Sequence, residues 1–232
     1  MKTKETYFVN FTENEKKLRF ILSKGEYDST IQDFYSHLSS EEKQIVENFK
    51  ASSRKNEFIA GRILAKENIR LLQKELTETG INIETGVWGF PLIQTKGISN
   101  MQISIAHTKH HAAAFLAEDN TYPIGVDVEE ILAENEESLD FYLSRYNKDF
   151  SLQEKYIYWA SKEAVSKALR TGFTIPEGVF EVKEIKAIGT FYEVSFKHLT
   201  RLKAIAWIQQ NTVISMAFPT ELKFDSIKSV TF

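Results

Sequence analysis

The chain has 232 residues, a net charge of −3 and 42% hydrophobic residues. This length suffices for one large domain or two small ones, and the composition is ordinary for a globular protein. The small net charge excludes a global attraction to nucleic acid or anionic lipid, and we expect neither as a partner. Because there is no cysteine, disulfides, thiolate chemistry and cysteine-ligated metals are excluded. No run approaches the roughly 20 apolar residues of a membrane helix, so we expect a cytoplasmic protein.

The first 119 residues predict a long helix followed by several strands. In chain order we expect a strand over 5–11, a mixed helical stretch to about residue 36, helices over 39–49 and 54–76, a turn-rich strand pair over 86–93, and strands over 101–108 and 111–117. Ser39 and Glu42 form a capping box at the start of the first of these helices. Gly61 inside the long helix costs about 1 kcal/mol relative to alanine, which indicates a close contact there.

The remaining residues predict a similar order. In chain order we expect a strand from Ile124, an acidic run that continues as a loop with a weak helix to 150, a helix over 151–172, and strands over 180–188, 191–199, 201–209 and 212–218. Ser151 and Glu154 form a second capping box. The repeated order predicts two related halves in the chain.

The stretch PIGVDVEEI, over 123–131, places two carboxylates in an otherwise apolar strand. Because strand side chains alternate, Gly125, Asp127 and Glu129 share one face, with the two acids roughly 7 Å apart at the backbone. Carboxylates this close repel each other unless a cation lies between them, and the glycine would admit a close neighbour. Two interpretations remain open: a solvated acidic face on an edge strand, and a site for a small cation.

The helical stretch WASKEAVSKAL places Trp159, Glu163 and Lys167 at i, i+4 and i+8, so they line one face. An ordinary solvated Glu–Lys pair, worth a few tenths of a kcal/mol, is one interpretation. The other interpretation is that Glu163 faces Asp127 and Glu129 of the strand, so that the three carboxylates together would make a magnesium site. The lysine one turn further on would then reach a phosphate bound to that ion.

GVDVE followed about thirty residues later by WASKEAVSK resembles the paired signature of the phosphopantetheinyl transferases of the surfactin-synthetase-associating type. That family shows G-[VI]-D-[VI]-E and then W-[ST]-x-K-E-x-x-x-K. The stretches HLSSEEKQIVENF and RKNEFIAGRILAKENI are similar to the family's N-terminal helices, including the arginine after a glycine, here Arg62. WGFPLI falls where the family has a glycine–lysine–proline turn, and ISIAHT where it has N-[IVL]-S-H-S. The resemblance covers most of the chain and thins after Thr190.

The resemblance implies an α+β fold of two similar α/β halves related by pseudo-twofold symmetry, residues 1–120 and 121–232, with the active site between them. It implies transfer of 4′-phosphopantetheine from coenzyme A to a serine of an apo acyl or peptidyl carrier protein. The second product would be adenosine 3′,5′-bisphosphate. We expect a monomer whose two halves resemble the two subunits of a dimer. The resemblance does not decide whether the carrier belongs to fatty-acid, polyketide or nonribosomal peptide synthesis.

The resemblance also implies roles for individual residues. Carried over by position, Asp127, Glu129 and Glu163 would hold Mg²⁺, Lys167 and Lys162 would contact the pyrophosphate, and His107 would lie at the 3′-phosphate with Arg62 nearby. Either Glu163 or a water held by the ion would take the serine proton. Attack on phosphorus needs charge neutralisation more than covalent help, and magnesium prefers oxygen ligands, so these residue types suit the reaction.

Three positions depart from the family pattern. Phe90 replaces the lysine of glycine–lysine–proline, Ala106 replaces the serine before the histidine, and Ala160 replaces a hydroxyl residue. The first two changes predict weaker binding of coenzyme A. The sequence alone therefore predicts that Phe90→Lys would lower the Michaelis constant for coenzyme A.

Two other functions follow from the same residues. A non-catalytic module of this fold that binds a carrier protein or coenzyme A is motivated by Phe90 and Ala106. A Mg²⁺-dependent phosphohydrolase built on the same carboxylates is the third hypothesis. His107, His110 and His111 suggest a zinc site, but a structural site needs four ligands, so we favour surface histidines at a turn. Arg62, Lys66 and Arg70 form a basic helical stripe, read either as a solvated face or as a surface for phosphate or docking.

Overall fold

Two antiparallel five-stranded sheets form the centre of the computed structural model, which describes residues 1–98, 100–143 and 150–230. The first sheet has the order β12 (Lys223–Ser229), β1 (Thr3–Glu13), β2 (Lys16–Glu26), β6 (His111–Ala117) and β5 (Gln102–His107). The second has the order β7 (Gly125–Glu130), β11 (Thr212–Pro219), β10 (Leu202–Gln209), β9 (Phe191–Phe196) and β8 (Val182–Ile188). A separate hairpin consists of β3 (Ile83–Thr85) and β4 (Pro91–Ile93).

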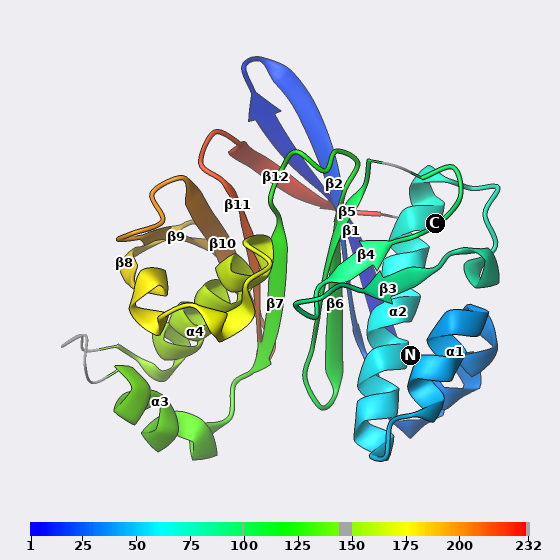
Figure 1. The fold of residues 1–232 in the computed structure, drawn as a ribbon. Coiled ribbons are helices and arrows are strands. Elements are labelled where there is room, and N and C mark those ends of the chain that lie inside the picture. The colour runs from blue at the N-terminus through cyan, green and yellow to red at the C-terminus, as the bar shows by residue number, and fades with distance from the viewer. Residues whose placement is uncertain (99, 144–149, 231–232) are drawn as a thin grey trace.

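Helices cover the outer faces of the two sheets. The α-helices are α1 (Ser40–Glu47), α2 (Ser52–Leu72), α3 (Glu136–Leu143) and α4 (Leu152–Ala168). Short 3₁₀ helices span Ser29–His37, Glu78–Gly80, Ala133–Asn135, Gly172–Thr174 and Glu177–Phe180. Figure 1 shows α2 and α4 on opposite sides of the molecule, with β5, β6 and β7 between them. The described helices include none that is both long enough and apolar enough to cross a membrane.

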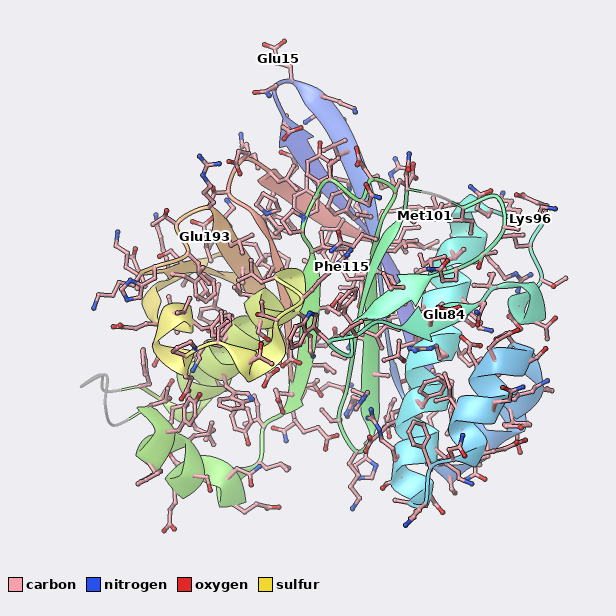
Figure 2. The ribbon with its side chains drawn as sticks, viewed as in Figure 1. Glu15, Glu84, Lys96, Met101, Phe115 and Glu193 are labelled. Carbon is pink, nitrogen blue, oxygen red and sulfur yellow. The ribbon has the colours of Figure 1, made fainter. Side chains whose placement is uncertain are left out.

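The hydrophobic core has three parts, which correspond to this layering. One cluster joins α2 to the first sheet and a second joins α4 to the second sheet. The third lies between the sheets, where Phe11, Phe20 and Phe115 of the first face Val126 and Ile214 of the second. Figure 2 shows Phe115 in the interior, and its side chain is fully buried. The arrangement is α+β, as the resemblance implies.

Most of the predicted elements are confirmed. The two capping boxes exist, and they start α1 at Ser40 and α4 at Leu152. Gly61 lies where α2 crosses β5, because an added Cβ would come within 2.6 Å of the Ile105 side chain. β11 is buried and paired on both sides, as expected for a central strand. The predicted weak helix corresponds to α3, and the part of that prediction over 144–149 lies outside the described residues.

The helical stretch predicted to about residue 36 is wrong over residues 16–26, which form β2. This strand pairs with β1 along its whole length. Asn14 and Glu15 connect the two with φ values of 46° and 67°, the positive pair that a tight two-residue hairpin turn requires. Asparagine tolerates this conformation, but the pair lacks the glycine that signals such a turn in a sequence.

The end of the chain returns to the first sheet. β12 pairs with β1, and Phe224 of β12 lies 6.0 Å from the Phe11 ring, centroid to centroid. Each sheet has its own long helix, but a strand from the second segment completes the sheet of the first. The division at residues 120 and 121, and the pseudo-twofold relation of the halves, therefore stay predictions.

Close packing of β7 against α4 depends on Gly125. A Cβ at this position would lie 1.9 Å from the Ala164 carbonyl oxygen and 2.7 Å from the Ala168 amide nitrogen. Both neighbours are helix backbone and cannot rotate away. The prediction that Gly125 admits a close neighbour is confirmed, and that neighbour is the helix carrying the second motif.

Gly125→Ala should therefore destabilise the protein by about 3 kcal/mol or more, the upper end for overpacking a core, because strand and helix must separate. The free energy of unfolding in urea measures this loss. Gly178→Ala is the matched control, since an added Cβ there meets nothing within 4 Å. Equal unfolding midpoints for the two variants would contradict this account of the packing.

Candidate active site

The carboxylates of β7 face α4, on the side of the strand opposite the core between the sheets. Val126 and Val128 belong to that core, whereas Asp127 and Glu129 share the face of Gly125. Asp127 is only 5% exposed. The interpretation of this stretch as a solvated acidic face is therefore wrong, although β7 does form one edge of its sheet.

One stripe of α4 meets these carboxylates. From Lys155 to Ala168 every helix residue is buried except Trp159, Glu163 and Lys167. The lysine Nζ lies 2.6 Å from Asp127 Oδ1, and the indole Nε1 of Trp159 donates a 3.0 Å hydrogen bond to Glu129 Oε1. The spacing of the helix motif thus brings strand and helix side chains together as predicted.

The site holds more negative charge than its surroundings neutralise. Burial raises the pKa of Asp127, and Lys167 offsets only part of that effect. Burial and the charges of Asp127 and Glu163 raise the pKa of Glu129 to about 8. Burial, followed by repulsion from Asp127, also raises the pKa of Glu163. Asp127 Oδ2 is buried and makes no hydrogen bond, so one carboxylate oxygen still lacks a partner.

Lys167 is the cation nearest to these acids. Burial works to lower its pKa, but the hydrogen bond to Asp127 and the charges of Asp127, Glu163 and Glu129 together outweigh burial, and the net pKa is raised. Its side chain is 29% exposed, so the ammonium also reaches solvent. Within residues 1–98, 100–143 and 150–230, no group of three or more His, Cys, Asp or Glu side chains is arranged to hold a metal ion. The magnesium site predicted at Asp127, Glu129 and Glu163 stays a prediction.

Lys162 lies apart from this stripe. Its side chain is fully buried, and its Nζ contacts Glu177 Oε1 at 2.6 Å and the Tyr142 hydroxyl at 2.9 Å. The same ammonium lies 4.4 Å from the Tyr142 ring centroid. These contacts favour a structural role between α4 and its neighbours, and the predicted contact of Lys162 with pyrophosphate stays a prediction.

His107 and Arg62 line one pocket of about 390 Å³, together with Arg54 and Glu57. Arg54 Nη1 lies 2.9 Å from His107 Nε2, and Glu57 Oε2 lies 3.1 Å from Arg54 Nη1. Burial lowers the pKa of His107 to about 4, although Glu57 works in the opposite direction. The histidine is therefore neutral near pH 7, and the cationic charge of the pocket comes from its two arginines.

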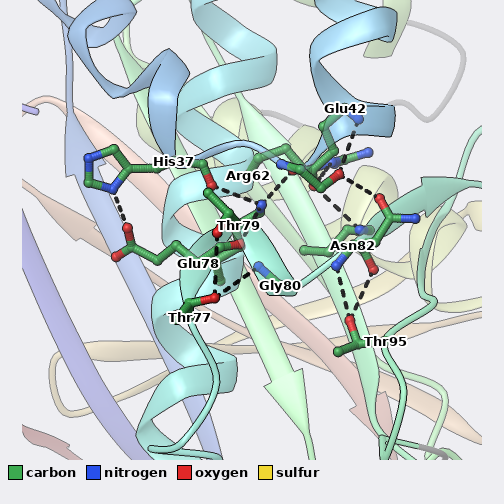
Figure 3. A network of polar contacts seen from close by, with 12 residues as sticks. His37, Glu42, Arg62, Thr77, Glu78, Thr79, Gly80, Asn82 and Thr95 are labelled. Carbon is green, nitrogen blue, oxygen red and sulfur yellow. Dashed lines mark hydrogen bonds and ion pairs between the residues drawn. The ribbon is translucent and has the colours of Figure 1, made fainter.

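A buried ionic network holds Arg62 in this pocket (Figure 3). Arg62 is 7% exposed, its Nε lies 3.5 Å from Glu42 Oε1, and its guanidinium stacks on the Phe58 ring at 4.3 Å. Lys66 Nζ lies 2.6 Å from the other oxygen of Glu42. Glu42 also accepts a hydrogen bond from the Ile83 amide, which ties α1 and α2 to the β3–β4 hairpin. The solvated-face interpretation is wrong for Arg62 and Lys66.

A second pocket of about 130 Å³ adjoins the first, since Gly89, Pro91 and Ile105 line both. Lys167 and Arg170 also line the second pocket, as do Trp88, Phe90, Ile103, Ser104 and Gly172. The end of α4, the β3–β4 hairpin and α2 therefore surround adjoining cavities with basic side chains. Sequence reasoning missed Arg54, Glu57 and Arg170; the only sequence signal was for Arg54 and Glu57, which are i,i+3 neighbours at the start of a predicted helix.

The remaining predicted features lie elsewhere. Ala106 is 2% exposed in the core between the sheets and lines neither pocket. His111 Nδ1 lies 3.1 Å from Glu130 Oε1, and Thr108 contacts the same oxygen, as expected of a turn. Another cavity, of about 840 Å³, lies beside Tyr122 and Arg201 and is lined by none of the predicted site residues.

These features define an α+β protein with a carboxylate–lysine site beside a basic, ligand-sized groove. Residues 123–215 match the family model of the 4′-phosphopantetheinyl transferase superfamily, and this segment carries Asp127, Glu129, Glu163 and Lys167. The predicted resemblance to that superfamily is confirmed over this segment. The surfactin-synthetase-associating subtype stays a prediction.

Solved structures are also similar to the chain. One is a holo-(acyl-carrier-protein) synthase from Bacillus anthracis str. Ames in complex with CoA (3′,5′-ADP). It is 22% identical with a TM-score of 0.36, over 46% of this chain and 95% of that one. A similarity this low carries no argument about the site. None of the curated proteins matches the chain.

The raised pKa of Glu129 predicts a pH-dependent stability in protein kept free of metal with a chelator. A carboxyl group whose pKa rises from 4.5 to about 8 on folding contributes stability that is present below pH 4.5 and lost as the pH rises through 8. Asp127 and Glu163 act in the same direction, because their pKa values are also raised. Thermal melting should therefore occur at lower temperature at pH 8.5 than at pH 6.5.

Glu129→Gln should flatten this slope, since glutamine does not titrate. His107 acts in the opposite direction, but only between its lowered pKa of about 4 and its ordinary 6.5, so the chosen range avoids it. Parallel slopes for Glu129→Gln and the unmodified protein would show that Glu129 titrates normally.

Proposed function

We propose that this protein transfers the 4′-phosphopantetheine group from coenzyme A to a serine of an apo carrier protein, in a Mg²⁺-dependent reaction. The serine oxygen attacks the phosphorus that carries pantetheine. The bond from that phosphorus to the bridging oxygen of the pyrophosphate breaks, and adenosine 3′,5′-bisphosphate leaves with the electron pair. One observation carries the proposal: the superfamily segment brings Asp127, Glu129 and Lys167 together beside a groove of basic residues.

The residues present suit a magnesium ion in their chemistry. Carboxylate oxygens are its preferred protein ligands, and it usually keeps several waters, so it needs few direct ones. The orphaned Asp127 Oδ2 and the raised pKa values of Glu129 and Glu163 all indicate a deficit of positive charge. When bound by Asp127, Glu129 and Glu163, the ion would neutralise charge on the pyrophosphate.

Two side chains of α4 would act on the reacting groups. Lys167 is partly exposed and lines the second pocket, so its ammonium would contact a pyrophosphate oxygen. Glu163, whose pKa is raised by burial, is suited to accept the serine proton near neutral pH. Both roles require a substrate in the groove between α4 and the hairpin.

The nucleotide end would lie in the first pocket. Arg54 and Arg62 supply charge there for the 3′-phosphate of coenzyme A, and neutral His107 offers a hydrogen bond. Glu57 orients Arg54 and His107 from the same pocket. We further propose a cytoplasmic monomer of two halves, 1–120 and 121–232, that acts on an acyl or peptidyl carrier of fatty-acid, polyketide or nonribosomal peptide synthesis.

A non-catalytic module that binds a carrier protein or coenzyme A is the second candidate. It is favoured by the Lys167–Asp127 ion pair, which occupies an oxygen that the metal would need. Calorimetry with coenzyme A and with an apo carrier separates the two candidates. Binding without a holo product would establish the module.

The direct test incubates the protein with coenzyme A, Mg²⁺ and a panel of apo carrier proteins, and measures intact mass. A carrier should gain the mass of phosphopantetheine. No gain on any carrier, with a known transferase active in parallel, would contradict the proposed function.

Substitutions at the site should separate metal binding from phosphate contact. Asp127→Ala and Glu163→Ala should each abolish transfer, because the ion loses an anionic ligand and the pyrophosphate charge stays uncompensated. Lys167→Ala should keep Mg²⁺ binding and lose about 2–4 kcal/mol of transition-state stabilisation, measured as kcat/KM. Glu134→Ala, in the exposed acidic run, is the control that should retain full transfer. Full transfer by Asp127→Ala would refute the site assignment.

A further inference from the structure

Arg170 lies two residues after the last residue of α4, and its backbone has a conformation that normally requires glycine. The Arg170 amide bonds the Lys167 carbonyl and the Thr171 amide bonds the Ser166 carbonyl, which is the double hydrogen-bond pattern of a Schellman C-cap. Arg170 occupies the left-handed position of this motif, with φ 57°. A side chain there is strained relative to glycine, so an arginine at this position calls for a compensating interaction.

Phe90 supplies that interaction from the tip of the β3–β4 hairpin. The guanidinium carbon of Arg170 lies 4.9 Å from the centroid of the Phe90 ring, within cation–π range. The ring also packs over Gly86 of the same hairpin, where an added Cβ would come within 2.9 Å of it. The phenyl ring is thus held by its own hairpin and forms a platform for a cation from α4.

The guanidinium keeps its hydrogen-bonding edge available. In the part of the chain that the structure describes, the Arg170 side chain makes its contact through the Phe90 ring and forms no ion pair. Stacking on a ring uses the face of the guanidinium and leaves its edge donors free to bind phosphate in a bidentate manner. Arg170 and Lys167 line the same cavity, and no carboxylate is among its lining residues.

We propose that Arg170 binds a pyrophosphate oxygen of the nucleotide substrate beside Lys167, and that Phe90 is its positioning residue. This inference rests on the proposed function. It also explains why position 90 can be a phenylalanine. The positive charge that a lysine would supply at that position is supplied instead by Arg170, at the end of α4. The predicted loss of a nucleotide contact at Phe90 is thereby compensated from another element of the fold.

The expectation for Phe90→Lys accordingly reverses. A lysine at this position would remove the platform and place a second cation beside the first. The substitution should weaken coenzyme A binding or leave it unchanged, rather than lower the Michaelis constant.

The test measures dissociation constants by calorimetry for coenzyme A and for dephospho-coenzyme A, which lacks the 3′-phosphate. Arg170→Gln should weaken both roughly ten- to one-hundred-fold, as for the loss of one charged hydrogen-bonded contact. Arg19→Gln is the matched control, because Arg19 stacks on Phe8 at 4.7 Å and lines neither pocket. It should bind both ligands as the unmodified protein does.

Two further variants separate binding from folding. Arg170→Gly should raise the melting temperature by roughly 2–4 °C, because glycine suits the left-handed position, while losing the same affinity as Arg170→Gln. Phe90→Leu should lose affinity and Phe90→Tyr should retain it. The double variant Phe90→Leu/Arg170→Gln should bind no worse than Arg170→Gln alone, since the two residues act as one unit.

The outcomes distinguish this inference from the proposed function. Unchanged affinity in Arg170→Gln, or a loss confined to coenzyme A, would overturn the pyrophosphate assignment while leaving the proposed transfer intact. Failure of the unmodified protein to bind either nucleotide would overturn the proposed function and this inference together.

Discussion

The contact between β7 and the backbone of α4 at Gly125 is the constraint on which the site depends. Because no side chain separates the two elements, the strand carboxylates lie directly under the helix face that carries Trp159, Glu163 and Lys167. A larger residue at position 125 would lift the helix and lengthen the 2.6 Å ion pair between Lys167 and Asp127. The distances between the charged groups are therefore set mainly by the packing of the β7 backbone against the α4 backbone at Gly125.

A second constraint is the packed interface between the two sheets at β5 and β7. The Val126 amide of β7 donates to Ser104 Oγ of β5, and the cluster of Phe20, Phe115 and Val126 fills the space beside it. Because β5 also carries His107, this interface fixes the position of the pocket lined by His107 relative to the carboxylates of β7. A ligand with two separated phosphate groups could thus contact both sheets at once, which is the arrangement that coenzyme A would need.

The sequence predicts the local parts of this site well. Asp127 and Glu129 follow from strand alternation, and Glu163 and Lys167 follow from helical spacing, so each pair requires only one element to be identified correctly. Capping boxes likewise reveal where helices begin, because the signal lies within four residues.

Features that depend on distant contacts could not be predicted in this way. β2 was missed because its turn, Asn14–Glu15, has no glycine, and because pairing with β1 overrides the local pattern. Lys162 is adjacent to Glu163 in sequence, yet it points into a buried aromatic pocket, and no spacing rule gives the partners found there. The pairing of Arg170 with Phe90 joins two loops far apart in the chain, so neither residue signals the other.

Several unfavourable features lie beside α4 or at its C-terminal end. Asp127 is buried with an unsatisfied oxygen, burial raises the pKa of Glu129 to about 8, and Arg170 occupies a backbone conformation suited to glycine. Each of these lowers the stability of the unliganded protein, and each involves a charged group that a bound cation or phosphate would satisfy. Their concentration around the last turns of α4 is therefore an argument, independent of sequence similarity, that this region serves a function beyond holding the fold together.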